Sequence, residues 1–300
     1  MSPEFRAGAT DLSERRRSGV SRGAILDISP EAAPAGLWPE PGGGLRLGAL
    51  TTIAALAADP TLRARYPGLA AAAGGLATPQ IRRVATLGGN LAQRNRCWYF
   101  RNPAFACLKT GGEGCPAREG NALYAVVFDR APCVAPHPST LAAALIAYDA
   151  RIDTDRRRDR SITEALGDGS SATAETALGL GELIVSVVLP PPTPNERAAY
   201  KRAIGRAQAE WPLVELVLSA AFAAGRFSRL RIVAGGIAPA PIRLAAAEAV
   251  ALGQLATPET FAAAAAAATQ GAAPLAQAAY KLDLLRGLVR DLLEAVSRTD

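Results

Sequence analysis

The spacing of apolar and polar residues predicts short strands and helices in the first third of the chain. Short apolar segments at residues 24–28 and 45–49 are typical of strands. Thr52 is placed to cap a helix that reaches residue 58, and Pro60 begins a second helix that a glycine pair ends at residue 75. Residues 76–95 show no sustained periodicity and predict a loop-rich stretch.

The remainder of the chain predicts an α+β fold in two domains. Strands followed by a run of helices favour this class, and a proline cluster at residues 190–194 is a linker candidate. We expect a first domain over 1–190 with a loop-dominated insert at 94–137, and a C-terminal domain over 196–300. The further strands expected are 151–154, 182–189, 200–204, 213–221 and 230–234, and the further helices are 139–148, 242–252, 258–269 and 282–297.

Charge and hydropathy exclude several classes of protein. The net charge of +6 comes almost wholly from scattered arginines, without interleaved aromatic residues, so nucleic-acid binding is disfavoured. No apolar run reaches the roughly 18 residues that span a bilayer. No secretory signal is recognisable at the start, which favours the cytoplasm unless a signal-bearing partner carries the protein to the periplasm.

All four cysteines lie in one window of the insert, with the spacing C-x9-C-x7-C-x17-C. Without a signal, disulfides are the weakest interpretation. A structural zinc site lacks its usual paired-cysteine knuckles, and four unrelated buried thiols also stay open. An iron–sulfur cluster is favoured because its thiolates converge from loops with variable spacing. The candidate ligands are Cys97, Cys107, Cys115 and Cys133, and nearby aromatic residues, Trp98, Tyr99, Phe100 and Phe105, are candidates for a dry wall around them.

Two small-residue loops have the character of phosphate-binding turns. Residues 6–12 follow an extended start, and residues 86–90 contain a glycine pair. Small residues let backbone N–H groups approach a pyrophosphate closely. Each loop alone is a weak signal. The single histidine, His137, lies between two prolines, and a structural hydrogen bond is favoured over a catalytic role.

Taken together, these segments resemble the flavin subunit of the xanthine dehydrogenase and carbon monoxide dehydrogenase family of molybdenum hydroxylases. That family's first loop usually reads A-G-G-T-D-L, and the second reads A-T-L-G-G-N. The matching segments, in order along nearly the whole chain, are Ala7-Gly8-Ala9-Thr10-Asp11-Leu12, Ala85 to Asn90, Ser139-Thr140-Leu141, Glu182-Leu183-Ile184, Tyr200-Lys201 and Ala234 to Pro239. The long gap that holds the cysteines is similar to the branch with an extra [4Fe–4S] cluster, such as bacterial aldehyde oxidoreductases.

The resemblance implies an FAD and [4Fe–4S] subunit with no catalytic residue of its own. Its partners would be a molybdenum-cofactor large subunit and a [2Fe–2S] small subunit, in a complex oxidising aldehydes or N-heterocycles. Electrons would pass from the [2Fe–2S] partner through this subunit to an external acceptor. The loop at residues 7–12 would hold the pyrophosphate, Leu183 and Ile184 would pack on the flavin ring, and Lys201 would stabilise reduced flavin. The implied FAD-binding residues are Ala7, Gly8, Ala9, Thr10, Asp11, Leu12, Ile81, Thr86, Gly89, Asn90, Ser139, Thr140, Leu183, Ile184 and Lys201.

Two departures from the family pattern motivate alternatives. Only five residues precede Arg6, where relatives carry a βα unit, and Thr140 stands where the family has aspartate. A flavin-free, cluster-bearing assembly subunit is therefore one rival. A zinc-stapled binding protein is the other.

Overall fold

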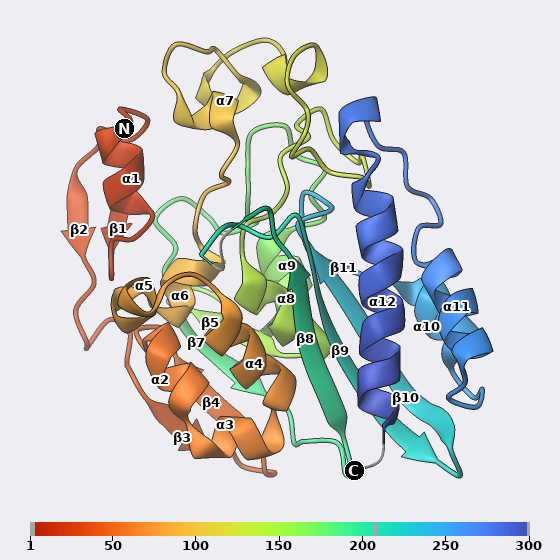
Figure 1. Cartoon of the computed structure of the whole chain (residues 1–300). Coiled ribbons are helices and arrows are strands. Elements are labelled where there is room, and N and C mark those ends of the chain that lie inside the picture. Colours follow the sequence, from red (N-terminus) through yellow and green to blue (C-terminus); the bar gives the residue numbers. More distant parts are fainter. Residues whose placement is uncertain (1–3, 207–208, 299–300) are drawn as a thin grey trace.

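The computed structural model describes residues 4–206 and 209–298 and contains three sheets (Figure 1). A two-stranded parallel sheet pairs β1 (Glu4–Arg6) with β2 (Ile25–Asp27) at the start of the chain. Because only three residue pairs join these strands, they hold the first loop without forming a core of their own. The combination of sheets and helices confirms the α+β class that the sequence predicts.

A five-stranded sheet forms the base of the first half of the chain. Its order is β3-β4-β7-β5-β6, and all its neighbours are antiparallel. The strands are β3 (Leu37–Pro39), β4 (Leu45–Gly48), β5 (Arg151–Thr154), β6 (Arg160–Ser161) and β7 (Ile184–Leu189). Helices pack beside this sheet around one buried apolar cluster: α2 (Ile53–Ala58), α3 (Pro60–Arg65), α4 (Pro67–Gly75), α6 (Leu87–Leu91), α8 (Thr140–Ala147) and α9 (Ile162–Leu166). Helix α5 (Pro79–Val84) lies outside this cluster, in contact with α2.

The expected loop over residues 76–95 is wrong, because this stretch forms the short helices α5 and α6. Thr78 and Thr86 each accept a backbone N–H with the side-chain oxygen, which satisfies a donor that the first helical turn leaves free. Pro79 starts α5 with its φ already suited to a helix. The expected helix over 60–75 is likewise two helices, because Pro67 restricts Tyr66 to a non-helical conformation.

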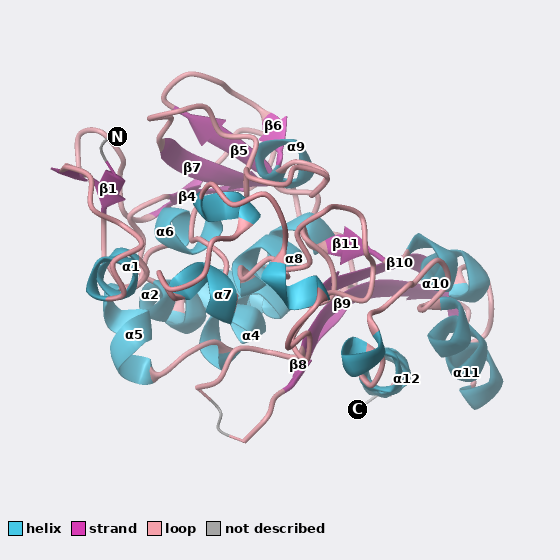
Figure 2. Ribbon diagram, turned by 90° about the horizontal axis from the view of Figure 1, so that it is seen from above, coloured by secondary structure: helices cyan, strands magenta, loops and turns pink. Residues whose placement is uncertain are grey.

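The C-terminal sheet has the order β11-β10-β9-β8 and lies between two groups of helices (Figure 2). Helices α4 and α8 contact one face, and α12 contacts the other. Alternation along β9 explains this, because Val217 belongs to the apolar cluster of the first half while Leu216 and Leu218 belong to a second cluster. The elements are β8 (Arg197–Ala203), β9 (Val214–Ala223), β10 (Arg226–Gly235), β11 (Ile242–Arg243), α10 (Ala245–Ala251), α11 (Pro258–Ala267) and α12 (Lys281–Ser297).

The three expected C-terminal strands are present, and β11 adds a short fourth strand at the edge. Residues 242–243 were expected to begin a helix, but they pair with β10 instead. Pairing with Ala234 and Val233 keeps these two residues extended. The helix therefore starts three residues later, at Ala245.

The insert contains little regular structure, as expected, but it has its own small core. Its elements are α7 (Trp98–Arg101) and two short 3₁₀ turns, Leu108–Thr110 and Pro116–Arg118. A third apolar cluster includes Tyr99, Val126 and Val134 from the insert together with Ala278 from the C-terminal region. Within residues 4–206 and 209–298, no helix is long and apolar enough to span a membrane.

Candidate functional site

A groove brings together most residues of the two small-residue loops. Ala7 to Leu12 line it on one side, Thr86 and Gly89 on another, and Leu183 and Ile184 close it with apolar surface. The groove has a volume of about 120 Å³. Ala85, Gly88 and Glu182 from the family-matching segments also line it. The remaining lining residues were not expected from the sequence: Phe5, Arg15, Ile28, Ala33, Ala49, Leu50, Ala92, Gln93 and Leu178.

The loop between β1 and α1 (Leu12–Arg17) has an anion-binding geometry. Ala9 has φ of 56°, a left-handed conformation that orients successive N–H groups to one side. The Ala9 carbonyl oxygen accepts a hydrogen bond from Ser13 N at 2.8 Å. Across the described chain, the N–H groups of Gly8 to Leu12 have no backbone acceptor outside the loop. Gly8 is required here, because a Cβ would lie 1.8 Å from the Val84 carbonyl oxygen.

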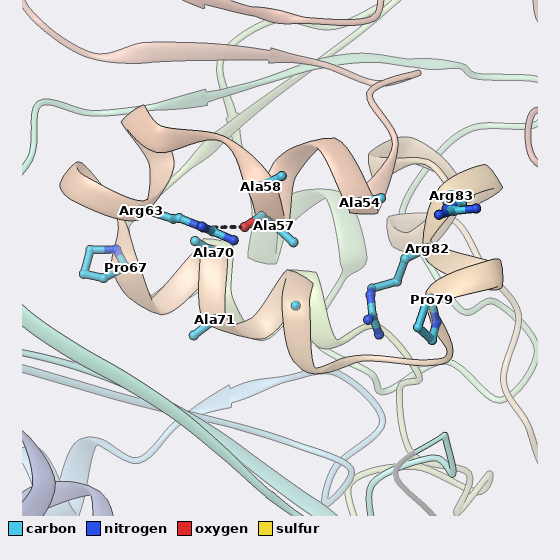
Figure 3. Close-up of a pocket in the computed structure, with 11 residues that line it drawn as sticks. Ala54, Ala57, Ala58, Arg63, Pro67, Ala70, Ala71, Pro79, Arg82 and Arg83 are labelled. Atoms are coloured by element: carbon cyan, nitrogen blue, oxygen red, sulfur yellow. Dashed lines mark hydrogen bonds between the residues drawn. The ribbon is translucent and has the colours of Figure 1, made fainter.

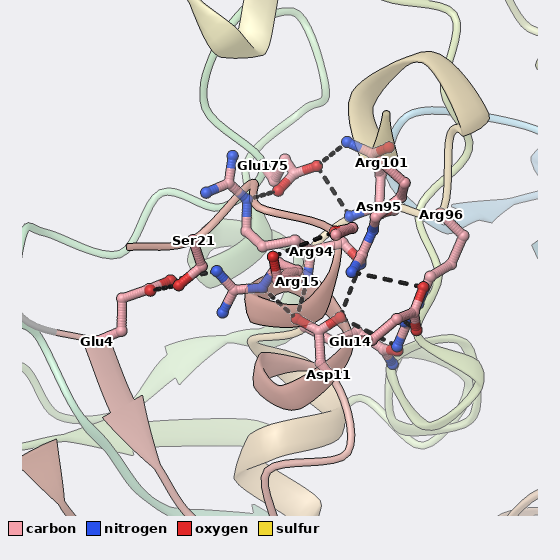
Figure 4. A network of polar contacts seen from close by, with 12 residues as sticks. Glu4, Asp11, Glu14, Arg15, Ser21, Arg94, Asn95, Arg96, Arg101 and Glu175 are labelled. Carbon is pink, nitrogen blue, oxygen red and sulfur yellow. Dashed lines mark hydrogen bonds and ion pairs between the residues drawn. The ribbon is translucent and has the colours of Figure 1, made fainter. Parts of the chain in front are cut away.

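Asp11 lies at the centre of an ion-pair network that joins this loop to the insert (Figure 4). Its carboxylate is 2.9 Å from Arg15 Nε, 3.1 Å from Arg96 Nη2 and 2.7 Å from Arg101 Nη2. Burial opposes ionisation of Asp11, but Arg96 and Arg101 outweigh burial and hold its pKa below the usual range. Asp11 therefore connects the groove mechanically to the cysteine-rich segment.

Glu175 extends this network to the far side of the insert. It pairs with Arg94, and one carboxylate oxygen accepts the N–H of Asn95 at 2.9 Å. Asn95 Oδ1 in turn accepts the N–H of Cys97 at 2.8 Å. The segment that leads into the first cysteine is thereby fixed by buried polar contacts.

Glu182 holds the opposite wall of the groove in place. Its carboxylate accepts hydrogen bonds from Arg157 Nε at 2.7 Å, Thr154 Oγ1 at 2.6 Å and Gly179 N at 2.6 Å. The hydrogen bonds from Arg157 lower the pKa of Glu182 to about 2. This anchoring places the following Leu183 and Ile184 at the groove.

Five of the implied FAD-binding residues do not line the groove. Asn90 Oδ1 accepts Ser139 Oγ at 2.7 Å, which ties α6 to the capping residue of α8. Thr140 donates to Glu215, Ile81 is 40% exposed on α5, and Lys201 pairs with Asp291 of α12. Asn90 and Ser139 thus support the groove structurally. Contacts of all five residues to FAD stay predictions. Lys201, Ile81 and Thr140 are accordingly not brought to the groove.

Glu215 is a buried acid that no sequence motif singles out. Its carboxyl accepts Thr140 Oγ1 at 2.8 Å and Tyr200 Oη at 2.9 Å, and the residue is 1% exposed. Burial raises its pKa to about 7, against the smaller opposing effect of these two donors. Such a residue can be found only when the strands are paired, because β8, β9 and α8 each supply one member.

The four cysteines converge on one small cavity. Cys97, Cys107, Cys115 and Cys133 all line it, together with Tyr99, Phe100 and Lys109 among others, and its volume is about 20 Å³. All four thiols are free. Burial raises the pKa of Cys97 and Cys133, and the neighbouring sulfurs reinforce that rise. Trp98 is 65% exposed, so the dry wall consists of Tyr99 and Phe100, with Phe105 packed edge-on against Tyr99.

No three His, Cys, Asp or Glu side chains in the described parts of the chain are close enough to hold a single metal ion. The four thiols nevertheless line one shared cavity.

A third depression, of about 610 Å³, lies among α2, α4 and α5 (Figure 3). Alanine is the commonest residue of its wall. Arg63 donates to the Ala57 carbonyl at 2.9 Å, and Arg82 donates to the Leu76 and Ala77 carbonyls. Both guanidinium groups donate to carbonyl oxygens near helix ends. The described residues of this wall form no group typical of a catalytic or binding site.

Comparison with known proteins agrees with this geometry. Residues 7–192 match the family model for the FAD binding domain in molybdopterin dehydrogenase, and residues 198–296 match the CO dehydrogenase flavoprotein C-terminal domain. The predicted domain limits lie close to these matches but stay predictions.

Two curated relatives from Escherichia coli strain K12 are similar in sequence. The aldehyde oxidoreductase FAD-binding subunit PaoB is 38% identical over 214 residues, covering 69% of this chain and 66% of that protein. A putative xanthine dehydrogenase FAD-binding subunit, XdhB, is 26% identical over 225 residues, covering 75% of this chain and 63% of that protein. The match thus spans about two thirds of the length of these relatives.

Solved structures share the fold. A chain of carbon monoxide dehydrogenase from Hydrogenophaga pseudoflava superposes with a TM-score of 0.75 at 23% identity, covering 98% of this chain and 89% of that one. A chain of quinoline 2-oxidoreductase from Pseudomonas putida 86 gives 0.74 at 18% identity, with the same coverage. The sequence matches over both halves show that this chain belongs to the family of FAD-binding medium subunits of the carbon monoxide dehydrogenase and xanthine dehydrogenase type.

Proposed function

We propose that the chain is the FAD and [4Fe–4S] electron-transfer subunit of a heteromeric molybdenum hydroxylase. The observation that carries this proposal is the convergence of all four cysteines on one cavity in a chain of this flavoprotein family. Bound FAD supplies hydride and single-electron chemistry, and the protein supplies position and electrostatics. The chain needs no catalytic side chain for that role.

The lining of the groove is chemically suited to the pyrophosphate and ring of FAD. Backbone N–H groups of Gly8 to Leu12 are available as donors, and the small residues Gly88 and Gly89 permit close approach. Leu183 and Ile184 offer apolar surface to an aromatic ring. These residues would hold and orient the flavin and exclude water from one side of it.

The cysteine cavity fits an iron–sulfur cluster by the chemistry of its ligands. Four thiols with two buried aromatic neighbours form a soft, largely dry donor set. A cavity of about 20 Å³ has room for about one water. The loops must therefore stand further apart around a cluster, and irregular backbone in the insert allows this adjustment.

Substrate and partners follow from the relatives. PaoB is described as a subunit of an aldehyde oxidoreductase, which favours aldehydes over N-heterocycles as substrates of the complex. We propose a molybdenum-cofactor subunit and a [2Fe–2S] subunit as partners, with electrons entering from the latter and leaving to an external acceptor. The Asp11 network would keep the flavin loop and the insert in fixed register for that transfer.

Affinity purification of the tagged chain from its native source tests this proposal. We expect co-purifying subunits with molybdenum and additional iron, and anaerobic bleaching of the flavin by an aldehyde. A purified chain that has flavin but neither partners nor aldehyde response would contradict the hydroxylase role. Zinc in place of iron and sulfide would contradict the cluster.

A further inference from the structure

A fourth cavity, of about 820 Å³, lies between the insert and the C-terminal sheet. It shares no lining residue with the FAD groove. Its volume is within the range of roughly 300–1,000 Å³ that is typical of small-molecule sites. Nothing in the proposed electron-transfer role uses this space.

Several exposed aromatic side chains lie on its walls. Trp98, Tyr124 and Trp211 line the cavity although they are 65%, 62% and 46% exposed. The guanidinium of Arg96 lies 4.4 Å from the Trp211 ring centroid, which fixes one face of that ring. Exposed aromatic residues gathered around a concavity are typical of a binding site, since flat rings stack on flat ligands.

His137 contributes a buried donor without a partner. Its Nδ1 accepts the N–H of Ser139 at 3.2 Å, so the proton of the neutral ring is on Nε2. That Nε2 is buried and has no hydrogen-bond partner among the described residues, and the side chain is only 4% exposed. A buried donor of this kind is costly unless something supplies an acceptor.

Lys281 offers a second donor on the same cavity. It is 1% exposed, and its Nζ donates to the carbonyl oxygens of Tyr124 at 3.1 Å and Gly236 at 3.0 Å. Burial lowers the pKa of Lys281 to about 7, so near neutral pH the protonated form, which has a third N–H beyond these two, is present in part. Glu210 is the single carboxylate among the described lining residues, and its oxygen already accepts Arg206 N at 2.7 Å.

We propose that this cavity binds a planar aromatic ligand whose carbonyl or carboxylate oxygens accept hydrogen bonds from His137 and Lys281. Trp98 and Trp211 provide the stacking surfaces. The ligand therefore has a flat apolar body and at least one acceptor oxygen at its rim.

The location favours a redox-active member of this class, a quinone. Cys97, Tyr99 and Ala135 border both this cavity and the cysteine cavity. A bound quinone would then lie beside the proposed cluster, a statement that rests on the proposed function. Binding itself does not depend on the cluster or the flavin.

Calorimetric titration of the full chain tests the proposal with two probes. Duroquinone is redox-active and, being fully substituted, does not add to thiols, whereas 2-naphthoate is a redox-inert aromatic carboxylate. We expect at least one to bind, with affinity about tenfold weaker in Trp211→Ala and Trp98→Ala, which corresponds to about 1.4 kcal/mol. His137→Leu, which removes the donor, should weaken binding about as much.

Trp38→Ala is the matched control, because Trp38 is 39% exposed and does not line the cavity. Its affinity should equal that of the unmodified chain. Failure of both probes, or equal binding by all variants, would overturn the proposal. So would displacement of the probe by FAD, because the cavity would then belong to the flavin. Absence of iron or flavin in the preparation would overturn the proposed function and leave this binding intact.

Discussion

The groove proposed for FAD and the cysteine insert reach a defined geometry in different ways. The groove is built where regular elements end: β1 gives way to α1, Thr86 caps α6, and β7 begins at Ile184. The insert has only one helical turn and two 3₁₀ turns between Cys97 and Cys133, and it orders itself around a small apolar cluster and buried polar contacts. The groove is therefore preorganised, whereas the insert depends on whatever the four thiols bind.

One link couples the two regions. Asp11 is in the groove loop, while two of its partners, Arg96 and Arg101, flank the first cysteine. The contrast predicts that changes in the insert remove the cluster and spare the flavin, that changes in the groove do the reverse, and that only Asp11 affects both.

Replacing Cys107 should have the largest effect. Cys107 is the most buried of the four thiols, at 8% exposure. Cys107→Ser should reduce iron from about four per chain to almost none, since the cluster loses a thiolate, while flavin content is retained. Iron and flavin assays on the same sample measure this. Thr110→Val keeps every thiol, although it loses the contacts of Thr110 Oγ1 to Cys107 N at 3.0 Å, Cys107 O at 3.1 Å and Cys107 Sγ at 3.6 Å, so it should keep its iron. Full iron in Cys107→Ser would refute the ligand assignment.

Asp11→Asn should destabilise the whole chain. Removing one partner of a buried ion-pair network leaves its arginines uncompensated, and the free energy of unfolding should fall by about 3–5 kcal/mol. The fold lowers the pKa of Asp11, so its contribution is present above the ordinary aspartate value of 3.8 and is lost as pH falls further. Denaturant titration measures both effects.

Asp27→Asn serves as the control for that experiment. Asp27 pairs with Arg6 at the surface, with 68% of its side chain exposed, so its loss should have almost no effect on the free energy of unfolding. Equal destabilisation by the two changes would show that the Asp11 network is no stronger than a surface pair.

Gly8→Ala should damage the groove alone. The new Cβ would lie 1.8 Å from the Val84 carbonyl oxygen, so the loop must move, at about 1–3 kcal/mol and with loss of flavin affinity. Iron content should not change. Gly74→Ala is the control, because the nearest atom is Ala57 Cβ at 3.8 Å, and this helical position should be stabilised by about 0.5–1 kcal/mol. Iron loss in Gly8→Ala would contradict the separation of the two regions.

Glu215→Gln should change how stability depends on pH. Burial raises the pKa of Glu215 to about 7 from 4.5, so its favourable contribution is complete below pH 4.5 and is lost as pH rises through about 7. The variant should lack this loss and gain stability relative to the unmodified chain across that window. Denaturation midpoints from about pH 4 to 8 measure it, and parallel curves would show that Glu215 does not titrate there.

Ala9→Gly should have the smallest effect. The left-handed φ of 56° costs a residue with a Cβ roughly 1 kcal/mol, so glycine should stabilise the loop and tighten flavin binding slightly. Ala77 has φ of 49° and does not line the groove, so Ala77→Gly should match the stability gain without the gain in affinity. Tighter flavin binding in both variants would show that the gain in affinity does not come from relieving strain at Ala9.

The sequence predicts the regular elements and the groove loops well, because both depend on local signals. The strand over 151–154 is observed as β5, and Thr52 caps α2 as expected. Short helices such as α6 are missed because one turn has too few residues to show periodicity. Ala7 to Leu12 meet Leu183 and Ile184 at the groove, as the resemblance implied.

Long-range polar contacts could not be predicted from the sequence. The sequence places Asp11 in a loop and gives no sign of its partners. Only the fold brings Arg96 and Arg101 to it from a distant part of the chain. The resemblance likewise implies that Lys201 contacts the flavin. In the structure Lys201 forms an ion pair with Asp291 of α12, because β8 and α12 pack together. Such pairings depend on tertiary packing, which leaves no local trace.

The most direct test of a flavin and cluster subunit is an anaerobic absorption spectrum with iron and acid-labile sulfide assays on one sample of the purified chain. We predict flavin bands together with about four irons and four sulfides per chain. Flavin without iron, or zinc in place of iron and sulfide, would contradict this assignment.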